Sequence, residues 1–130
     1  MPDSTDWRRW VMYAENDLGS GLKLLEDYPT NASRNFHQSA EKFLKAVLVY
    51  RNIEPSRTHD VRVLVNLVDP AVATDALEMQ GARLLTLVGG RTRYPDAYSE
   101  PTTEEARALA QAVGVIRRFA LSYLPGDVAQ

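Results

Sequence analysis

Apolar side chains recur every three or four residues through most of the chain, and no segment alternates as a half-buried strand would. This spacing is that of the α-helix, in which such residues line one face. The first stripe comprises Trp7, Trp10, Val11, Ala14, Leu18, Leu22 and Leu25. The pattern therefore predicts an all-α fold.

Capping and breaking residues divide this pattern into about five helices, which we expect to form an up-and-down bundle. The first, second and fifth helices are long, and the third and fourth are short. The expected helices run from Ser4 or Thr5 to Tyr28, Asn31 to Asn52, Thr58 to Asp69, Thr74 or Asp75 to Gly89, and Thr102 to Leu124. We assign residues 1–124 to a single helical domain and residues 125–130 to a frayed tail.

Glycines and one capping motif give finer expectations. Gly21 lies on the first apolar stripe, although a glycine within a helix costs about 1 kcal/mol relative to alanine. We expect a second helix to cross closely there. Gly89 and Gly90 are expected to stop the fourth helix. Thr102-x-x-Glu105 has the spacing of a capping box and predicts the start of the last helix.

Composition narrows the functional classes. The net charge of −2 and the sequence pI of about 5.7 argue against a dedicated binder of duplex DNA, but they leave room for a local basic pocket. The chain has no cysteine, so it has neither a disulfide nor a thiol nucleophile. It has no apolar run of about 18 residues and no signal-like N-terminus, which predicts a cytoplasmic protein without membrane contact.

The histidine content also limits metal and cofactor chemistry. His37 and His59 are the only two histidines, too few for a structural zinc site of about four Cys or His ligands. Neither follows a glutamate by three residues, as a di-iron bundle requires. No phosphate-loop or dinucleotide motif is present. We therefore expect no metal, no cofactor and no catalytic residue, and we interpret the His37/Glu41 pair as a surface hydrogen bond.

The second helix carries two different faces. Phe36, Ala40, Phe43 and Val47 form its apolar side, whereas the other side carries Arg34, His37, Gln38, Glu41, Lys42 and Lys45. The simpler interpretation of this polar face is a solvated, salt-bridged surface. The functional interpretation is that Lys42 and Lys45 bind phosphate. His59, beside a turn, can bond a backbone carbonyl or a ligand.

A segment rich in Gly, Pro and Tyr between Gly89 and Pro101 offers a second cluster. Arg93 and Tyr94 stand there next to Pro95, which stiffens the backbone. A guanidinium and a phenol on a stiff loop suit phosphate contact and base stacking. The same loop can equally pack back on its own bundle.

Four motifs, in this order and spacing, resemble the HEPN domain family (higher eukaryotes and prokaryotes nucleotide-binding), in its branch with an EK-x-x-K helix and an RYPD loop. They are Ala14-x-x-Asp17-Leu18, Gln38-x-x-Glu41-Lys42-x-x-Lys45-x-x-Leu48, Arg57-Thr58-His59-Asp60 and Thr92-Arg93-Tyr94-Pro95-Asp96. The resemblance implies a bundle of four to five helices and a homodimer. It also implies, as in many bacterial and archaeal members, a minimal nucleotidyltransferase as partner, some such pairs acting as toxin and antitoxin.

One property of the family does not carry over. Its ribonucleases use an arginine followed by a histidine with four to six residues between them. Here Arg34 and His37 are separated by two residues, Arg51 and His59 by seven, and Arg57 and His59 by one. The sequence therefore disfavours that mode of RNA cleavage.

The leading hypothesis is a non-catalytic homodimeric subunit that binds a nucleotide or RNA, with a nucleotidyltransferase as a candidate partner. Its expected binding residues are Lys42, Lys45, His59, Arg93 and Tyr94. Apolar residues beyond a single stripe on the first helix support self-association. One alternative is a ribonuclease toxin whose rearranged site uses His59 with Arg57 or Arg93. The other is a structural docking subunit without a ligand.

Overall fold

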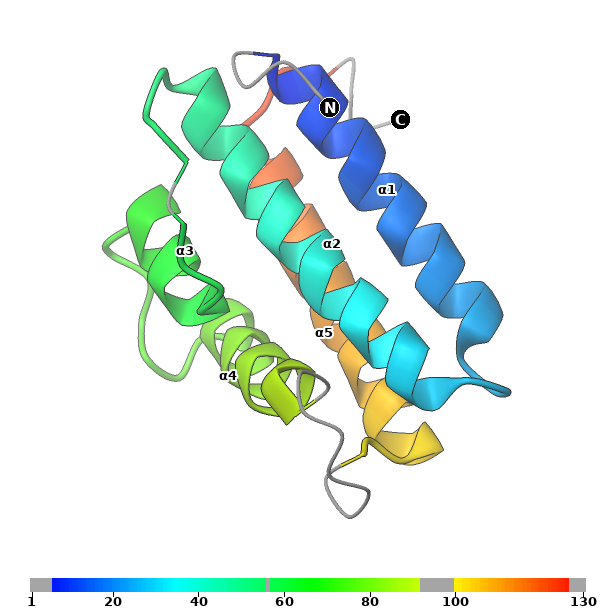
Figure 1. Ribbon diagram of the computed structural model, residues 1–130. Helices are drawn as coiled ribbons and strands as arrows, with labels where there is room; N and C mark the ends of the chain where they lie inside the picture. The colour runs from blue at the N-terminus through cyan, green and yellow to red at the C-terminus, as the bar shows by residue number, and fades with distance from the viewer. Residues whose placement is uncertain (1–5, 56, 92–99, 127–130) are drawn as a thin grey trace.

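The computed structural model describes residues 6–55, 57–91 and 100–126, and these residues form five helices and no strand (Figure 1). The helices are α1 (Trp7–Leu24), α2 (Pro29–Tyr50), α3 (Val61–Val68), α4 (Leu77–Arg91) and α5 (Thr103–Leu121). The all-α prediction and the predicted order of helices are confirmed. α4, which we expected to be one of two short helices, has 15 residues.

The central element of the bundle is α2, which packs against each of the other four helices. In Figure 1, α1 lies along one flank of α2, α3 and α4 lie along the other, and α5 lies behind it. The predicted apolar side of α2 is fully buried at Phe36, Ala40, Phe43 and Val47. Because neighbours surround α2, part of its polar side is buried as well.

Gly21 marks the close crossing of α1 and α2, as its position on the apolar stripe predicted. A Cβ atom at Gly21 would lie 2.5 Å from Cε1 and 2.8 Å from Cδ1 of Phe36, whose side chain is fully buried. Such distances are shorter than van der Waals contact, so the phenyl ring occupies the space that a side chain would need.

Gly21→Ala is expected to lower the free energy of unfolding by about 1–3 kcal/mol, because the enclosed Phe36 ring cannot move aside without disturbing the core. Gly19→Ala is the matched control, since a Cβ built there has no described heavy atom within 4 Å other than its chain neighbours and the nearby backbone of its own helix. The control should leave stability unchanged or raise it by up to about 1 kcal/mol. Urea unfolding of both variants checks this prediction, and equal midpoints would contradict it.

Several helix ends differ from the predicted ones by a few residues. Asp6 caps α1 by accepting a hydrogen bond from the Arg8 amide, while Ser4 and Thr5 lie outside the described residues. α2 starts at Pro29 rather than Asn31, because proline at the first helical position has its fixed φ and loses no hydrogen bond. The same helix ends at Tyr50, two residues before Asn52, which has a φ of 65°.

The later boundaries also need correction. α3 is capped by Asp60 rather than by Thr58, whose hydroxyl instead accepts a hydrogen bond from the Asp60 amide. α4 starts at Leu77, after the predicted Thr74 or Asp75, and continues through the two glycines to Arg91. The capping box of Thr102 and Glu105 is confirmed in both of its hydrogen bonds.

None of the described helices combines the length and the apolar content that crossing a bilayer requires.

Candidate functional site

A hollow of about 430 Å³ opens beside α2, a volume within the range of about 300–1,000 Å³ typical of small-molecule sites. We call it the α2 hollow. It is lined by Arg34, His37, Gln38, Glu41, Lys42, His59 and Gly89. Five of these residues recur on α2 at spacings of three and four, which places them on one face of the helix. The other two come from the turn before α3 and from α4.

A second hollow of about 360 Å³ adjoins the first, and we call it the α3 hollow. It is lined by His37, Arg57, Thr58, His59, Asp60, Thr86 and Gly90. The two hollows share His37 and His59. The two histidines of the chain therefore stand at the boundary between them.

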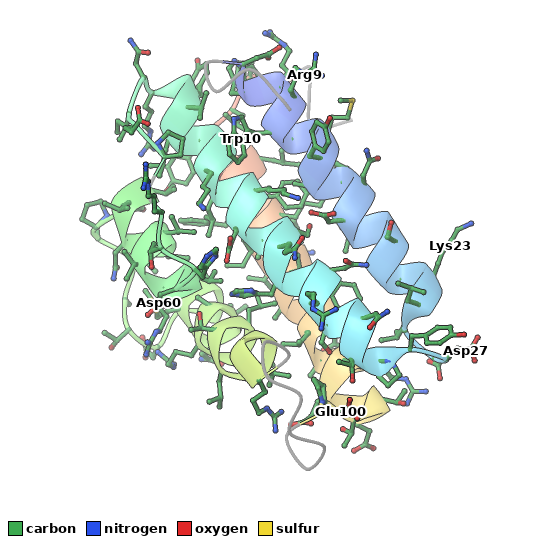
Figure 2. All side chains as sticks on the ribbon, viewed as in Figure 1. Arg9, Trp10, Lys23, Asp27, Asp60 and Glu100 are labelled. Atoms are coloured by element: carbon green, nitrogen blue, oxygen red, sulfur yellow. The ribbon has the colours of Figure 1, made fainter. Side chains whose placement is uncertain are left out.

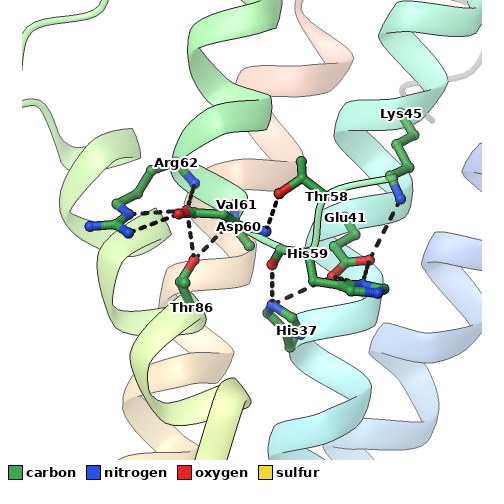
Figure 3. A network of polar contacts seen from close by, with 9 residues as sticks. All are labelled: His37, Glu41, Lys45, Thr58, His59, Asp60, Val61, Arg62 and Thr86. Atoms are coloured by element: carbon green, nitrogen blue, oxygen red, sulfur yellow. Dashed lines mark hydrogen bonds and ion pairs between the residues drawn. The ribbon is translucent and has the colours of Figure 1, made fainter. Parts of the chain in front are cut away.

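Glu41 is the centre of the polar contacts around these hollows (Figure 3). Its side chain is 9% exposed, and its Oε1 and Oε2 lie 3.0 and 3.3 Å from Nδ1 of His59. Nζ of Lys45 lies 3.8 Å from Oε2, and Nε2 of His37 lies 3.5 Å from Oε1. A buried carboxylate is costly without such partners, so these contacts compensate for its desolvation.

The acceptors in this network determine where the imidazole protons lie. An ionised carboxylate only accepts hydrogen bonds, so His59 donates from Nδ1 to Glu41 and keeps its Nε2 for other contacts. The backbone carbonyl of His59 likewise only accepts, so Nε2 of His37 donates to it at 2.9 Å. The His59 side chain is 60% exposed. Its imidazole is thus held at one nitrogen and accessible to a ligand.

One imidazole nitrogen of this network is occupied by a hydrogen bond. The Nε2 proton of His37 is directed at the His59 carbonyl, so that nitrogen has no lone pair for a metal ion. Among the residues that the structure describes, no group of three or more His, Asp or Glu side chains has metal-binding geometry.

The structure brings three of the five predicted binding residues together. Lys42 and His59 line the α2 hollow, and Lys45 contacts Glu41 behind it. Lys42 also forms an ion pair with Asp17 of α1. Arg93 and Tyr94 lie outside the described residues. The binding role of all five stays a prediction.

The burial of His37 and Glu41 and the packing role of Gly89 were not predicted from the sequence. We interpreted the first two as a surface pair, yet His37 is 5% and Glu41 7% exposed. Gly89 does not stop α4: a Cβ there would lie 2.7 Å from Cγ of His37, so the glycine lets α4 approach α2. The signal available in the sequence was the glycine pair itself, which marks close backbone approach as well as helix ends.

The surroundings of the two hollows are locally positive. Among the described residues that line them or form ion pairs with that lining, five cationic side chains face three carboxylates. The cations are Arg34, Lys42, Lys45, Arg57 and Arg62, and the carboxylates are Asp17, Glu41 and Asp60. The whole chain, in contrast, has a net charge of −2. The described residues of this site therefore carry a local excess of positive charge.

Asp60 holds the turn that presents His59. Its carboxylate accepts hydrogen bonds from the Arg62 amide and guanidinium and from the Thr86 hydroxyl, which itself accepts from the Val61 amide. The side-chain hydrogen bond from Arg62 is the main cause that lowers the pKa of Asp60 below its usual 3.8. At neutral pH Asp60 is ionised and its charge is paired.

This pKa predicts how the turn responds to acid. A carboxyl whose pKa is lower in the folded chain stabilises the fold above its ordinary pKa, and this contribution is lost as the pH falls through the folded value. Asp60→Asn keeps a capping side chain but loses the ion pair. We expect it to be less stable than the parent at pH 7, and we expect the difference to shrink towards pH 3. Urea unfolding across this range checks the prediction, which a constant difference would contradict.

Comparisons with known proteins agree with this architecture. The family model of the HEPN domain matches residues 7–123. The chain belongs to the HEPN domain family. The crystal structure of TT1696 from Thermus thermophilus resembles this HEPN protein with a TM-score of 0.79 and 25% sequence identity, covering 92% of this chain and 99% of that one. No curated protein matches the sequence of this HEPN protein.

Proposed function

We propose that this HEPN protein is a non-catalytic subunit that binds a nucleotide or a short RNA, with phosphate held in the α2 hollow. The observation that carries the proposal is the convergence of Arg34, Lys42 and His59 on one hollow of about 430 Å³. Arg34 and Lys42 lie on one face of α2, and the packing of the turn before α3 against this helix adds His59 to them.

The side chains of the α2 hollow suit an anion. Arginine presents a fork of donors that matches two phosphate oxygens. Gln38 adds an amide, and the ammonium of Lys42 has three donor hydrogens, of which Asp17 uses one. Since Lys45 lies beside Glu41, the buried carboxylate repels an incoming phosphate less than an unpaired one would.

Arg34→Gln and Lys42→Met are each expected to weaken the binding of a fluorescent ATP analogue at least about tenfold. A hydrogen bond to a charged group contributes about 1.5–3 kcal/mol, and about 1.4 kcal/mol corresponds to tenfold in affinity. Lys23→Gln is the matched control. Lys23 is exposed and projects from the end of α1, on the side of the bundle opposite to Asp60 (Figure 2).

The control should bind the nucleotide as the parent protein does. Arg93→Gln and Tyr94→Ala extend the test to the predicted residues outside the described ranges. Equal affinity in Arg34→Gln, Lys42→Met and Lys23→Gln, or no binding by the parent, contradicts the proposal. The second outcome favours a docking subunit without a ligand.

A homodimer, with a minimal nucleotidyltransferase as a further partner, completes the proposal. Two of the α1 side chains that suggested self-association differ in the structure: Trp7 is 8% exposed and belongs to the core, whereas Met12 is 48% exposed. Sedimentation equilibrium at micromolar concentration should give twice the mass of one chain. A species of 14.6 kDa alone contradicts the dimer.

The contact of His59 with Glu41 favours one alternative, a ribonuclease with a rearranged site. An exposed imidazole held at Nδ1 by a buried carboxylate is an arrangement used for acid–base catalysis. Arg57, in the adjoining hollow, is the nearest candidate in the sequence to stabilise a developing charge.

This alternative predicts that the purified protein cleaves single-stranded RNA and that His59→Ala abolishes the cleavage. Arg83→Ala, which changes an exposed arginine of α4 away from the lining of both hollows, should cleave as the parent does. RNA left intact by the parent protein excludes this function.

A further inference from the structure

The two hollows form a paired site rather than two unrelated ones. Both have volumes typical of ligand sites, about 430 and 360 Å³, and both include His37 and His59 in their lining. The remaining lining residues differ. A ligand that fills the α2 hollow therefore has a second hollow directly beyond His59.

Each hollow has its own side chains suited to a phosphate-bearing unit. Arg34 and Lys42 line the α2 hollow, and Arg57 lines the α3 hollow together with Thr58. Asp60 also lines the α3 hollow. Its carboxylate is engaged by Arg62 at 2.8 Å, so its charge is offset there.

We infer that the preferred ligand is a phosphodiester-linked dinucleotide or a longer single strand, with one nucleotide in each hollow and the linking phosphate beside His59. The inference rests on the proposed function and makes it more specific. A mononucleotide fills one hollow only. A second nucleotide joined to it binds the adjoining hollow as an intramolecular step, which raises the overall affinity without any change in the first hollow.

The test compares AMP, ADP and the dinucleotide pApA by isothermal titration. ADP adds charge without a second nucleoside, so it separates electrostatic gain from occupation of the α3 hollow. We expect pApA to bind at least about tenfold more tightly than AMP, and ADP to remain within about threefold of AMP. Arg57→Gln should remove the gain of pApA and leave AMP unchanged, whereas Arg34→Gln should weaken both.

Lys23→Gln is the control for loss of one positive charge, and circular dichroism establishes that each variant is folded. AMP binding with no gain for pApA, or a gain that survives Arg57→Gln, overturns the inference and leaves the proposed function standing. If neither AMP nor pApA binds the parent protein, both are overturned. Binding of pApA without measurable binding of AMP supports both.

Discussion

Gly89→Ala is expected to weaken nucleotide binding at least about tenfold and to destabilise the fold by about 1–3 kcal/mol. An added Cβ would lie 2.7 Å from Cγ and 2.8 Å from Cβ of His37. These are the first two atoms of the side chain, so a change of rotamer cannot move them away as it can move the end of a long side chain. Either α4 moves away from α2, or His37 leaves its position and loses the hydrogen bond to the His59 carbonyl.

Gly90→Ala is the matched control for this variant. The two glycines are adjacent in α4, yet a Cβ built at Gly90 has no described heavy atom within 4 Å other than its chain neighbours and the nearby backbone of its own helix. The control measures helix propensity and should raise stability by up to about 1 kcal/mol. It should not change the affinity for AMP, because Gly90 lines the α3 hollow and not the α2 hollow. Urea unfolding and nucleotide titration of both variants provide the measurement. Similar behaviour of the two would mean that close packing at His37 does not shape the site.

The fold could be predicted from the sequence because its signals are local. The apolar stripe of α1, the breaker Pro29 and the capping box at Thr102 act within a few residues of chain. Errors arose where two local rules compete. A glycine pair commonly ends a helix, but Gly89 is retained inside α4 because its missing side chain makes room for His37 of α2.

The candidate site was predictable only in part, because its contacts join distant positions. Basic residues on one face of the second helix could be found from helical spacing, and His59 from its place beside a turn. That Glu41 pairs with His59, 18 residues away, depends on how the turn before α3 folds back on α2. Periodicity cannot distinguish a polar face in solvent from one buried by a loop, so His37 and Glu41 were interpreted as surface residues.

Glu41→Gln is expected to destabilise the protein by about 3 kcal/mol, although the two side chains have nearly the same shape. Removing one partner of a buried ion pair leaves the other charge desolvated and uncompensated. Here that charge is the ammonium of Lys45, whose side chain is 12% exposed and which lies 3.8 Å from Glu41. His59 also loses the carboxylate that accepts from its Nδ1, and a neutral amide replaces it as a weaker acceptor.

The double variant Glu41→Gln/Lys45→Met separates the charge from the rest of the network. Methionine keeps most of the buried hydrocarbon of Lys45 and removes its ammonium, so the double variant should recover about 1–2 kcal/mol of the loss. Glu41→Gln/Lys23→Met, in which the exposed lysine at the end of α1 is changed instead, should recover nothing. Urea unfolding at pH 7 measures all three variants. If both double variants are as unstable as Glu41→Gln, the buried carboxylate acts through His59 and His37 rather than through Lys45.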